Sequence, residues 1–145
     1  MTADANYAPS PIGFVADQVR DYEASGGAEG NEMMGKPIVI LTTTGRHSGK
    51  LRKSPLMRVE RDGQYVVVAS MGGAPQHPTW YLNLVANPRV TLQDGAKIFE
   101  ANARTLTGDE RADWWPTMVE AWPAYDDYQK KTDREIPVVL LEPIN

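Results

Sequence analysis

The chain of 145 residues contains no cysteine and only two histidines, His47 and His77. Without cysteine it has no disulfide framework, no thiolate nucleophile and no metal centre built on thiolates. Two histidines leave little for any other metal site, so we expect no bound metal. No apolar run approaches the roughly 18 residues of a membrane span, and the first 11 residues lack the basic start of a signal peptide. These absences predict a cytoplasmic protein, and the length predicts a single domain.

The motifs of hydrolytic enzymes are missing as well. There is no G-x-S-x-G, H-E-x-x-H or paired-carboxylate arrangement, and neither histidine stands beside a candidate nucleophile. Residues 45–50 (GRHSGK) resemble a phosphate-binding P-loop, but the spacing is one residue short and Leu51 replaces the Ser or Thr that binds magnesium. If the chain is an enzyme, we expect its reactive group to belong to an organic cofactor.

Basic residues are few but clustered. The net charge is -4, from 15 basic and 19 acidic residues. Residues 46–58 hold five of the basic side chains and no acid, so the remaining ten basic and 19 acidic residues give -9. A nucleic-acid-binding protein needs a broad basic face, whereas one compact basic segment suits a small anion. The sequence therefore argues against a nucleic-acid partner.

Hydrophobic periodicity predicts a mainly β chain with short helices, an α+β class. The expected helices are 12–25, 79–86, one from Gly108 with Thr107 and Glu110 as a capping box, and 123–132. The expected strands are 37–44, 51–60, 65–70, 90–93, 97–106 and 136–141, with hairpin turns at Asp62-Gly63 and Asp94-Gly95. Six strands without βαβ alternation favour a closed or split antiparallel barrel over a doubly wound sheet.

Four short motifs are candidates for a site, and each has a structural alternative. The donors of the basic loop (residues 45–50) suit an anion, although a solvated hairpin tip has the same composition. Residues 70–73 (SMGG) offer a hydroxyl and bare backbone to a flat ring, or form an ordinary turn. Residues 79–83 begin a helix with free N–H donors, or supply core aromatics. Trp122, Tyr125 and Tyr128 repeat every third residue, as a core stripe or as a lid over a cleft.

Taken together, five ordered motifs resemble the deazaflavin-dependent nitroreductase family over roughly residues 36–143. They are residues 37–49 (PIVILTTTGRHSG), Arg52 with Pro55-Leu56, residues 69–73 (ASMGG), residues 78–84 (PTWYLNL) with 86–88 (ANP), and residues 136–138 (IPV). The resemblance implies a six-stranded antiparallel split β-barrel with about four short helices. It places the barrel domain at 36–145, after an N-terminal tail and helix at 1–35. It also implies that coenzyme F-420 carries hydride to quinones, nitroaromatics or activated lactones such as coumarins and aflatoxins.

The resemblance also implies site residues. For the phosphate and acidic tail of the cofactor they are Arg46, His47, Ser48 and Arg52. Toward and around its ring they are Lys53, Ser54, Pro55, Leu56, Met57, Val68, Ala69, Ser70, Met71, Thr79, Trp80, Tyr81, Leu82 and Asn83. For the acceptor they are Met57, Trp122, Tyr125 and Tyr128. Ser70 and Tyr125 are the candidate catalytic residues, because the proton that follows the hydride comes either from solvent or from a nearby hydroxyl such as theirs.

Departures from the family pattern sharpen these expectations. Many members have Lys in place of His47 and Met71, so we expect the anion contacts to shift to the remaining basic residues. A Tyr that touches nitroimidazoles can occur in place of Met57, so quinone or ene reduction is favoured over nitroimidazole activation. Residues 1–35 hold six acids and one Arg, which argues against membrane docking.

Two rival functions remain at this point. The same barrel can use FMN, whose lone phosphate also suits the basic loop. A non-catalytic deazaflavin-binding protein is the second rival. Monomer and homodimer are both compatible with the sequence.

Overall fold

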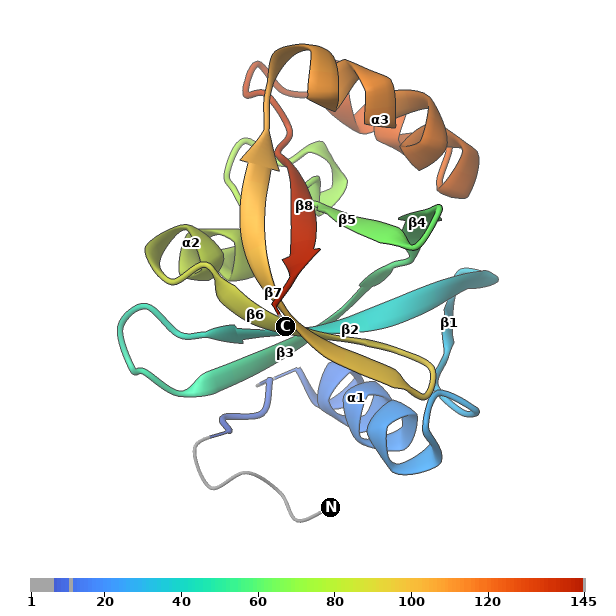
Figure 1. The fold of residues 1–145 in the computed structure, drawn as a ribbon, viewed down its shortest axis with the longest axis vertical. Helices are drawn as coiled ribbons and strands as arrows, with labels where there is room; N and C mark the ends of the chain where they lie inside the picture. Colours follow the sequence, from blue (N-terminus) through green and yellow to red (C-terminus); the bar gives the residue numbers. More distant parts are fainter. Residues whose placement is uncertain (1–6, 11, 145) are drawn as a thin grey trace.

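An antiparallel sheet curls into a split barrel, with α1 on one side and α3 on the opposite side (Figure 1). The computed structural model describes residues 7–10 and 12–144; residues 1–6 and 11 of the expected N-terminal tail and residue 145 lie outside that description. The strands are β1 (Glu32–Met33), β2 (Lys36–Thr44), β3 (Leu51–Met57), β4 (Val59–Arg61), β5 (Gln64–Val68), β6 (Arg89–Asp94), β7 (Lys97–Leu106) and β8 (Val138–Pro143). The helices are α1 (Gly13–Ser25), α2 (Thr79–Ala86), α3 (Gly108–Ala121) and α4 (Ala124–Lys130), with a 3-10 turn η1 (Met71–Gly73).

The barrel closes because one segment of the chain pairs with two strands. The sheet order is β1-β2-β6-β7-β8-β5-β4, and β3 pairs with β2. Since only Arg58 separates β3 from β4, this segment joins β2 at one end and β5 at the other. The backbone N–H of Arg58 donates to the carbonyl of Pro37 at 3.1 Å where the segment bends. The expected split-barrel class is confirmed.

The expected number of six strands is wrong for the described residues, in which the structure has eight. The strand expected at 51–60 breaks at Arg58, because its two halves face different partners. The second addition is β1, expected as loop. It pairs Met33 with Lys36 across a two-residue turn in which Met34 and Gly35 have φ of 54° and 77°. The hairpin expected at Asp62-Gly63 is confirmed, and both residues have the positive φ of a type I′ turn, 54° and 82°.

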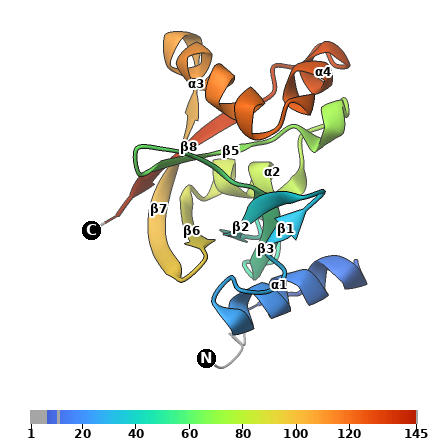
Figure 2. The same ribbon diagram turned by 90° about the vertical axis from the view of Figure 1, so that its right-hand side faces the viewer.

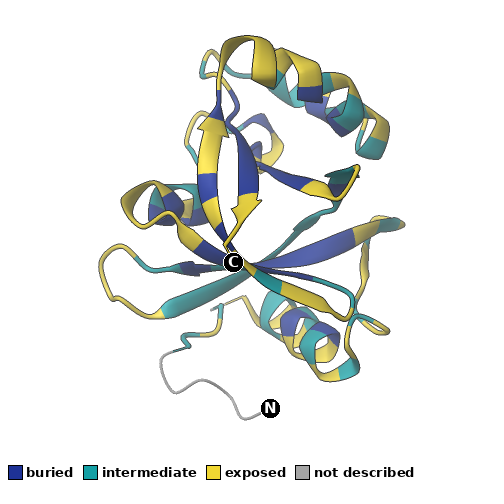
Figure 3. Ribbon diagram, viewed as in Figure 1, coloured by how far each residue is buried: buried dark blue, intermediate teal, exposed yellow. Residues whose placement is uncertain are grey.

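The side chains of β2 alternate between two parts of the core. Figure 3 shows β2 as one of the most buried strands. Val39 and Leu41 point into the barrel. Ile38 and Ile40 point outward and pack against Val19 and Tyr22 of α1. On β5 and β8 the outward-pointing residues pack in the same way against Trp114, Met118 and Tyr125 of α3 and α4, which lie on the opposite side of the barrel from α1 (Figure 2). Helices thus cover the barrel wall from outside on two sides.

Two details of the expected helices are corrected. Phe14 has the helical spacing that predicts a place on the buried face of α1, but it is 74% exposed, because the contacts of α1 with β2 come from Val19 and Tyr22. Thr107 makes no side-chain cap hydrogen bond, although α3 begins where the capping box predicts. Glu110 bonds Arg104 at 2.9 and 3.1 Å, so its carboxylate is turned away from a capping role.

A charged cluster joins the bend of the β3–β4 segment to the neighbouring strands. Arg58 Nε donates to both carboxylate oxygens of Asp94 at 3.0 Å, and the Tyr65 hydroxyl donates to the same carboxylate. Burial, followed by the bond to Asp94, raises the pKa of Tyr65 to about 12. Because these residues lie on β5, on β6 and at the bend, Asp94 links three parts of the barrel.

Replacing Asp94 by Asn tests this link. We expect the Asp94→Asn variant to lose about 1–3 kcal/mol of unfolding free energy, since a part-buried Arg58 loses its counter-charge. Urea unfolding followed by circular dichroism measures it. The matched control is Glu100→Gln in the exposed pair with Arg89, where we expect little change. Equal losses in the two variants would contradict the role given to Asp94.

Candidate active site

A cavity of about 300 Å³ lies between the barrel wall and α4. Its lining comes from five regions that are distant in sequence: β1 with its turn, β3, the end of β5 with η1, the start of α2, and the α3–α4 region. The lining residues are Met33, Met34, Pro55, Leu56, Met57, Val68, Ser70, Met71, Gly72, Pro78, Trp80, Trp122, Tyr125 and Tyr128. None of these fourteen side chains is charged. The cavity therefore suits a flat, neutral ring more than an ion.

The structure brings together part of the predicted set. All four predicted acceptor residues line the cavity, with seven of the predicted cofactor residues: Pro55, Leu56, Met57, Val68, Ser70, Met71 and Trp80. The others lie outside the lining: Arg46, His47, Ser48, Arg52, Lys53, Ser54, Ala69, Thr79, Tyr81, Leu82 and Asn83. Met33 and Met34 were missed, because the short strand that places them carries no motif. A Met-Gly pair before a β-branched strand was the one signal of a turn there.

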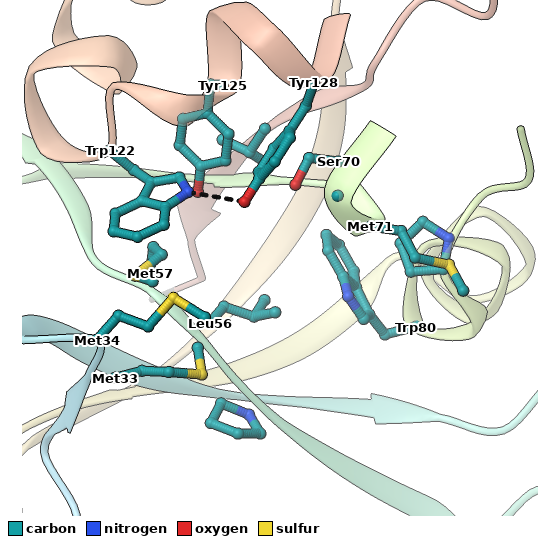
Figure 4. Close-up of a pocket in the computed structure, with 14 residues that line it drawn as sticks. Met33, Met34, Leu56, Met57, Ser70, Met71, Trp80, Trp122, Tyr125 and Tyr128 are labelled. Atoms are coloured by element: carbon teal, nitrogen blue, oxygen red, sulfur yellow. Dashed lines mark hydrogen bonds between the residues drawn. The ribbon is translucent and has the colours of Figure 1, made fainter. Parts of the chain in front are cut away.

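The aromatic residues around α4 form one wall of the cavity (Figure 4). Trp122 Nε1 donates to the Tyr128 hydroxyl at 3.3 Å, and the rings of Tyr125 and Tyr128 meet edge to face at 6.2 Å. Tyr125 is 4% exposed and belongs to the core, while Trp122 and Tyr128 are half-buried. Burial, and then Tyr128, raise the pKa of Tyr125 well above its usual range. Its hydroxyl is therefore protonated at physiological pH, as in any tyrosine, and it is a weaker acid than an exposed tyrosine.

A tight turn at residues 70–73 forms the adjoining wall. Met71, Gly72 and Gly73 have successive φ values of 46°, 64° and 81°, a left-handed backbone that a non-glycine residue adopts only at a cost. A Cβ on Gly73 would stand 2.6 Å from the carbonyl oxygen of Tyr128. Glycine is needed there because the turn packs directly against α4. Gly72 opens toward the cavity, as the sequence suggests for a ring lying on bare backbone.

Beside the cavity, the basic loop displays its side chains to solvent. Arg46, His47, Ser48 and Lys50 are exposed. The backbone N–H of Arg46 donates to the side-chain oxygen of Asn83 at 3.1 Å, and Asn83 is buried. Asn83 therefore anchors the loop to α2, three residues after Trp80 in the cavity wall. One turn of α2 therefore connects the basic loop to the apolar cavity.

Two predicted cofactor residues on β3 are engaged by the N-terminal part of the chain. Arg52 Nη1 donates to the carbonyls of Ala8 and Pro9 at 3.3 and 3.4 Å. Lys53 Nζ bonds Glu23 of α1 at 2.6 Å, with its side chain 8% exposed. These contacts turn Lys53 toward α1, so a direct contact of Lys53 with a cofactor stays a prediction.

His77 stands in the loop between η1 and α2. Its Nδ1 lies 3.2 Å from the guanidinium of Arg134, and its ring contacts Tyr81 with centroids 4.9 Å apart. Since a guanidinium only donates, Nδ1 accepts and the ring is neutral. Burial, and then the charge of Arg134, lower the pKa of His77. Through these contacts, His77 helps to hold the loop between η1 and α2 in place.

Searches of the described residues 7–10 and 12–144 find no group of three or more metal-type side chains and no helix long and apolar enough to cross a membrane.

Comparison with known proteins decides the family. A family model described as F420H(2)-dependent quinone reductase matches residues 15–143. The chain belongs to this family. The expected deazaflavin family is thereby confirmed, as are its oxidoreductase class and reduced coenzyme F-420 as the hydride donor.

Individual relatives agree with this assignment. A putative F420H(2)-dependent quinone reductase of Mycobacterium tuberculosis is 37% identical over 107 residues, 74% of this chain and 90% of the relative. A solved F420-H2 dependent reductase (FDR-A) is 57% identical, with a TM-score of 0.69, over 73% of this chain and 94% of that one. A structure described as a domain-swapped dimer is 50% identical, with a TM-score of 0.72, over 92% of this chain and all of that one (100%).

For this quinone reductase family member, the neutral state of His77 predicts a pH effect on stability. In the unfolded chain His77 takes up a proton near the ordinary histidine pKa of 6.5, whereas in the folded protein it does so only at lower pH. The unfolded state therefore binds more protons in that window, and stability falls as the pH drops below about 6.5. We expect His77→Gln to lose less unfolding free energy than the wild type between about pH 7.5 and pH 5.5. Parallel pH curves from urea unfolding would contradict the neutral assignment.

Proposed function

We propose that the chain transfers a hydride from reduced coenzyme F-420 to a quinone or a similar small, electron-poor acceptor held in the cavity. The observation that carries the proposal is an uncharged cavity of sulfur and aromatic side chains directly beside an exposed basic loop, in a member of this family. The two surfaces match the two chemistries of the cofactor, an apolar ring and a multiply charged tail.

The residues present fit the cofactor. Exposed Arg46 and Lys50 offer cationic donors to a phosphodiester and to carboxylates. The bare backbone of Gly72 and the side chains of Ser70 and Val68 line a wall suited to a flat ring. Because Trp80 and Asn83 lie on α2, the helix sets the distance between the ring and tail sites. We extend the proposal to all the residues predicted to bind the cofactor. Arg52 and Lys53 would act while keeping their contacts with the N-terminal part of the chain.

Bound in its reduced form, the cofactor supplies a hydride, and the chain's residues do the rest. The methionine and aromatic side chains exclude water and orient the acceptor. Tyr125 and Ser70 both line the cavity, and tyrosine and serine hydroxyls carry their protons at physiological pH. We assign to these two hydroxyls the proton that follows the hydride.

The cavity lining also bears on the choice of acceptor. With no charged residue in the lining, a neutral quinone or ene is better matched than an ionised substrate. Met33, Met34, Met57 and Met71 are flexible and polarisable, and such side chains adapt to aromatic ligands of different outline. We therefore propose quinones first, with nitroaromatics, coumarins and aflatoxin-type lactones as further acceptors to be compared.

The proposal extends to the domain division and the oligomeric state of the chain. We propose residues 36–145 as the cofactor-binding barrel domain. The described part of residues 1–35 adds α1, the contacts with β3, and β1 with the cavity residues Met33 and Met34. Monomer and homodimer are both compatible with the cavity, and the relative described as a domain-swapped dimer favours testing for a dimer.

The cofactor assignment is tested by fluorescence titration of the apoprotein with oxidised F-420 and with FMN. We expect F-420 to bind more tightly, because its tail adds contacts that a lone phosphate lacks. Arg46→Gln should weaken F-420 binding about tenfold, the value of one charge-assisted contact. Arg20→Gln, which alters an exposed arginine of α1, is the control and should bind like the wild type. Tighter binding of FMN would favour the rival cofactor.

Turnover with reduced F-420 and menadione tests the role of Tyr125. We expect Tyr125→Phe, which removes only the hydroxyl, to lower kcat at least about tenfold by loss of a proton donor, and Tyr125→Ala to lower it further. Tyr65→Phe removes a hydroxyl at the bend of the barrel and should keep the wild-type kcat.

Two outcomes would contradict the assignments made for turnover. Unchanged kinetics in Tyr125→Ala would remove Tyr125 from the acceptor site. A wild-type protein that binds F-420 but oxidises its reduced form with none of a panel of quinones, nitroaromatics and coumarins would establish the non-catalytic rival.

A further inference from the structure

We propose that Arg134 is a positioning residue, which fixes the 70–73 turn as a wall of the cavity. The proposal rests on the proposed function for its kinetic consequence and on contacts within the chain for its structural one. Arg134 lies between α4 and β8 and does not line the cavity. No motif in the sequence marks it.

The guanidinium of Arg134 donates hydrogen bonds to three backbone carbonyls of the loop. Nη2 donates to the carbonyl of Ser70 at 2.7 Å, Nε to that of Ala74 at 2.8 Å, and Nη1 to that of Ala69 at 3.0 Å. Nη1 also lies 3.2 Å from Nδ1 of His77. None of the ion pairs within residues 7–10 and 12–144 includes Arg134. Its donors are therefore directed to backbone carbonyls and an imidazole.

This arrangement holds a backbone that needs support. Met71 has φ of 46° without being glycine, and it begins three successive left-handed residues, a conformation that persists only where its surroundings enforce it. The Arg134 contacts lie on both sides of these residues, at Ser70 before them and at Ala74 after them. A planar fork of donors can hold both ends at once, and a lysine ammonium cannot reproduce that geometry.

Arg134 is itself held by α4, which forms the adjoining wall of the cavity. Gln129 of α4 donates its side-chain N–H to the carbonyl of Arg134 at 2.8 Å and accepts the N–H of Ile136 at 2.9 Å. Gly73 packs against Tyr128 of the same helix. The turn with Ser70 and the helix with Tyr125 are therefore one connected unit, and Arg134 sets their separation. A displacement of about 1 Å at a reacting site can cost a hundredfold in rate.

The structural part is tested by amide hydrogen exchange in the protein without cofactor. In Arg134→Ala we expect exchange of the peptide covering residues 69–77 to rise at least about tenfold, since its conformation loses its anchor. The matched control is Arg61→Ala, since Arg61 also donates to a backbone carbonyl, that of Asp113 at 3.2 Å, and its printed contacts involve neither the turn nor Gln129. The control should leave the 69–77 peptide unchanged. Wild-type exchange in Arg134→Ala, or an equal rise in both variants, overturns the proposal.

The functional part is tested by kinetics normalised to bound cofactor. Titration with oxidised F-420 gives the concentration of sites that bind the cofactor. Dividing the rate by this concentration separates a lower kcat from a smaller fraction of folded protein. We expect Arg134→Ala to lower kcat per site at least about tenfold through misplacement. The KM for reduced F-420 should change less than about threefold, because the basic loop still holds the tail.

Chemical rescue separates positioning from general stability. Low millimolar guanidinium should restore at least part of kcat in Arg134→Ala, while sodium at equal ionic strength should not. Arg134→Lys, which keeps a cation, is a second variant should Arg134→Ala fold poorly, and it should remain impaired. Wild-type kcat per site in Arg134→Lys, or the absence of rescue, overturns the proposal, whereas an inactive wild type would instead refute the proposed function.

Discussion

Closure of the barrel by the β3–β4 segment is the constraint on which the rest of the structure depends. The segment must bend at Arg58 to pair with β2 and then with β5, and the bend is joined to Asp94 and Tyr65 by a charged cluster. Because β3 carries Pro55, Leu56 and Met57 to the cavity just before this bend, the same constraint places one wall of the candidate site. The opposite wall is placed by α4, which packs on the turn after β5.

The charged residues and the cavity occupy different parts of the protein. The exposed cations of the basic loop stand outside the cavity, and the fourteen residues of the cavity lining carry no charge. Asn83 and Trp80, on successive turns of α2, connect the two regions. Such an arrangement lets the affinity for an anionic cofactor come from one place and the environment of the reacting ring from another.

Sequence reasoning succeeded where the signal is local. The Asp62-Gly63 turn, the strand around Val39 and the helix from Thr79 follow from turn chemistry and periodicity, and each is present. Ordered motifs located most of the cavity wall. Local patterns failed where distant contacts decide, as at Arg58, where one expected strand divides between two partners. They also missed Met34, whose place depends on a two-residue strand, and Arg134, whose contacts lie about 60 positions earlier in the chain.

With the basic loop binding the cofactor tail and the cavity binding the acceptor, as proposed, the two ligands depend on different forces. Attraction of the basic loop for an anionic tail acts through solvent, so it weakens as ionic strength rises. Contact of a neutral acceptor with methionine and aromatic side chains is a matter of excluded water, which moderate salt leaves nearly untouched. The salt content of its surroundings can therefore adjust how readily the protein takes up its reductant without altering which molecules it accepts for reduction.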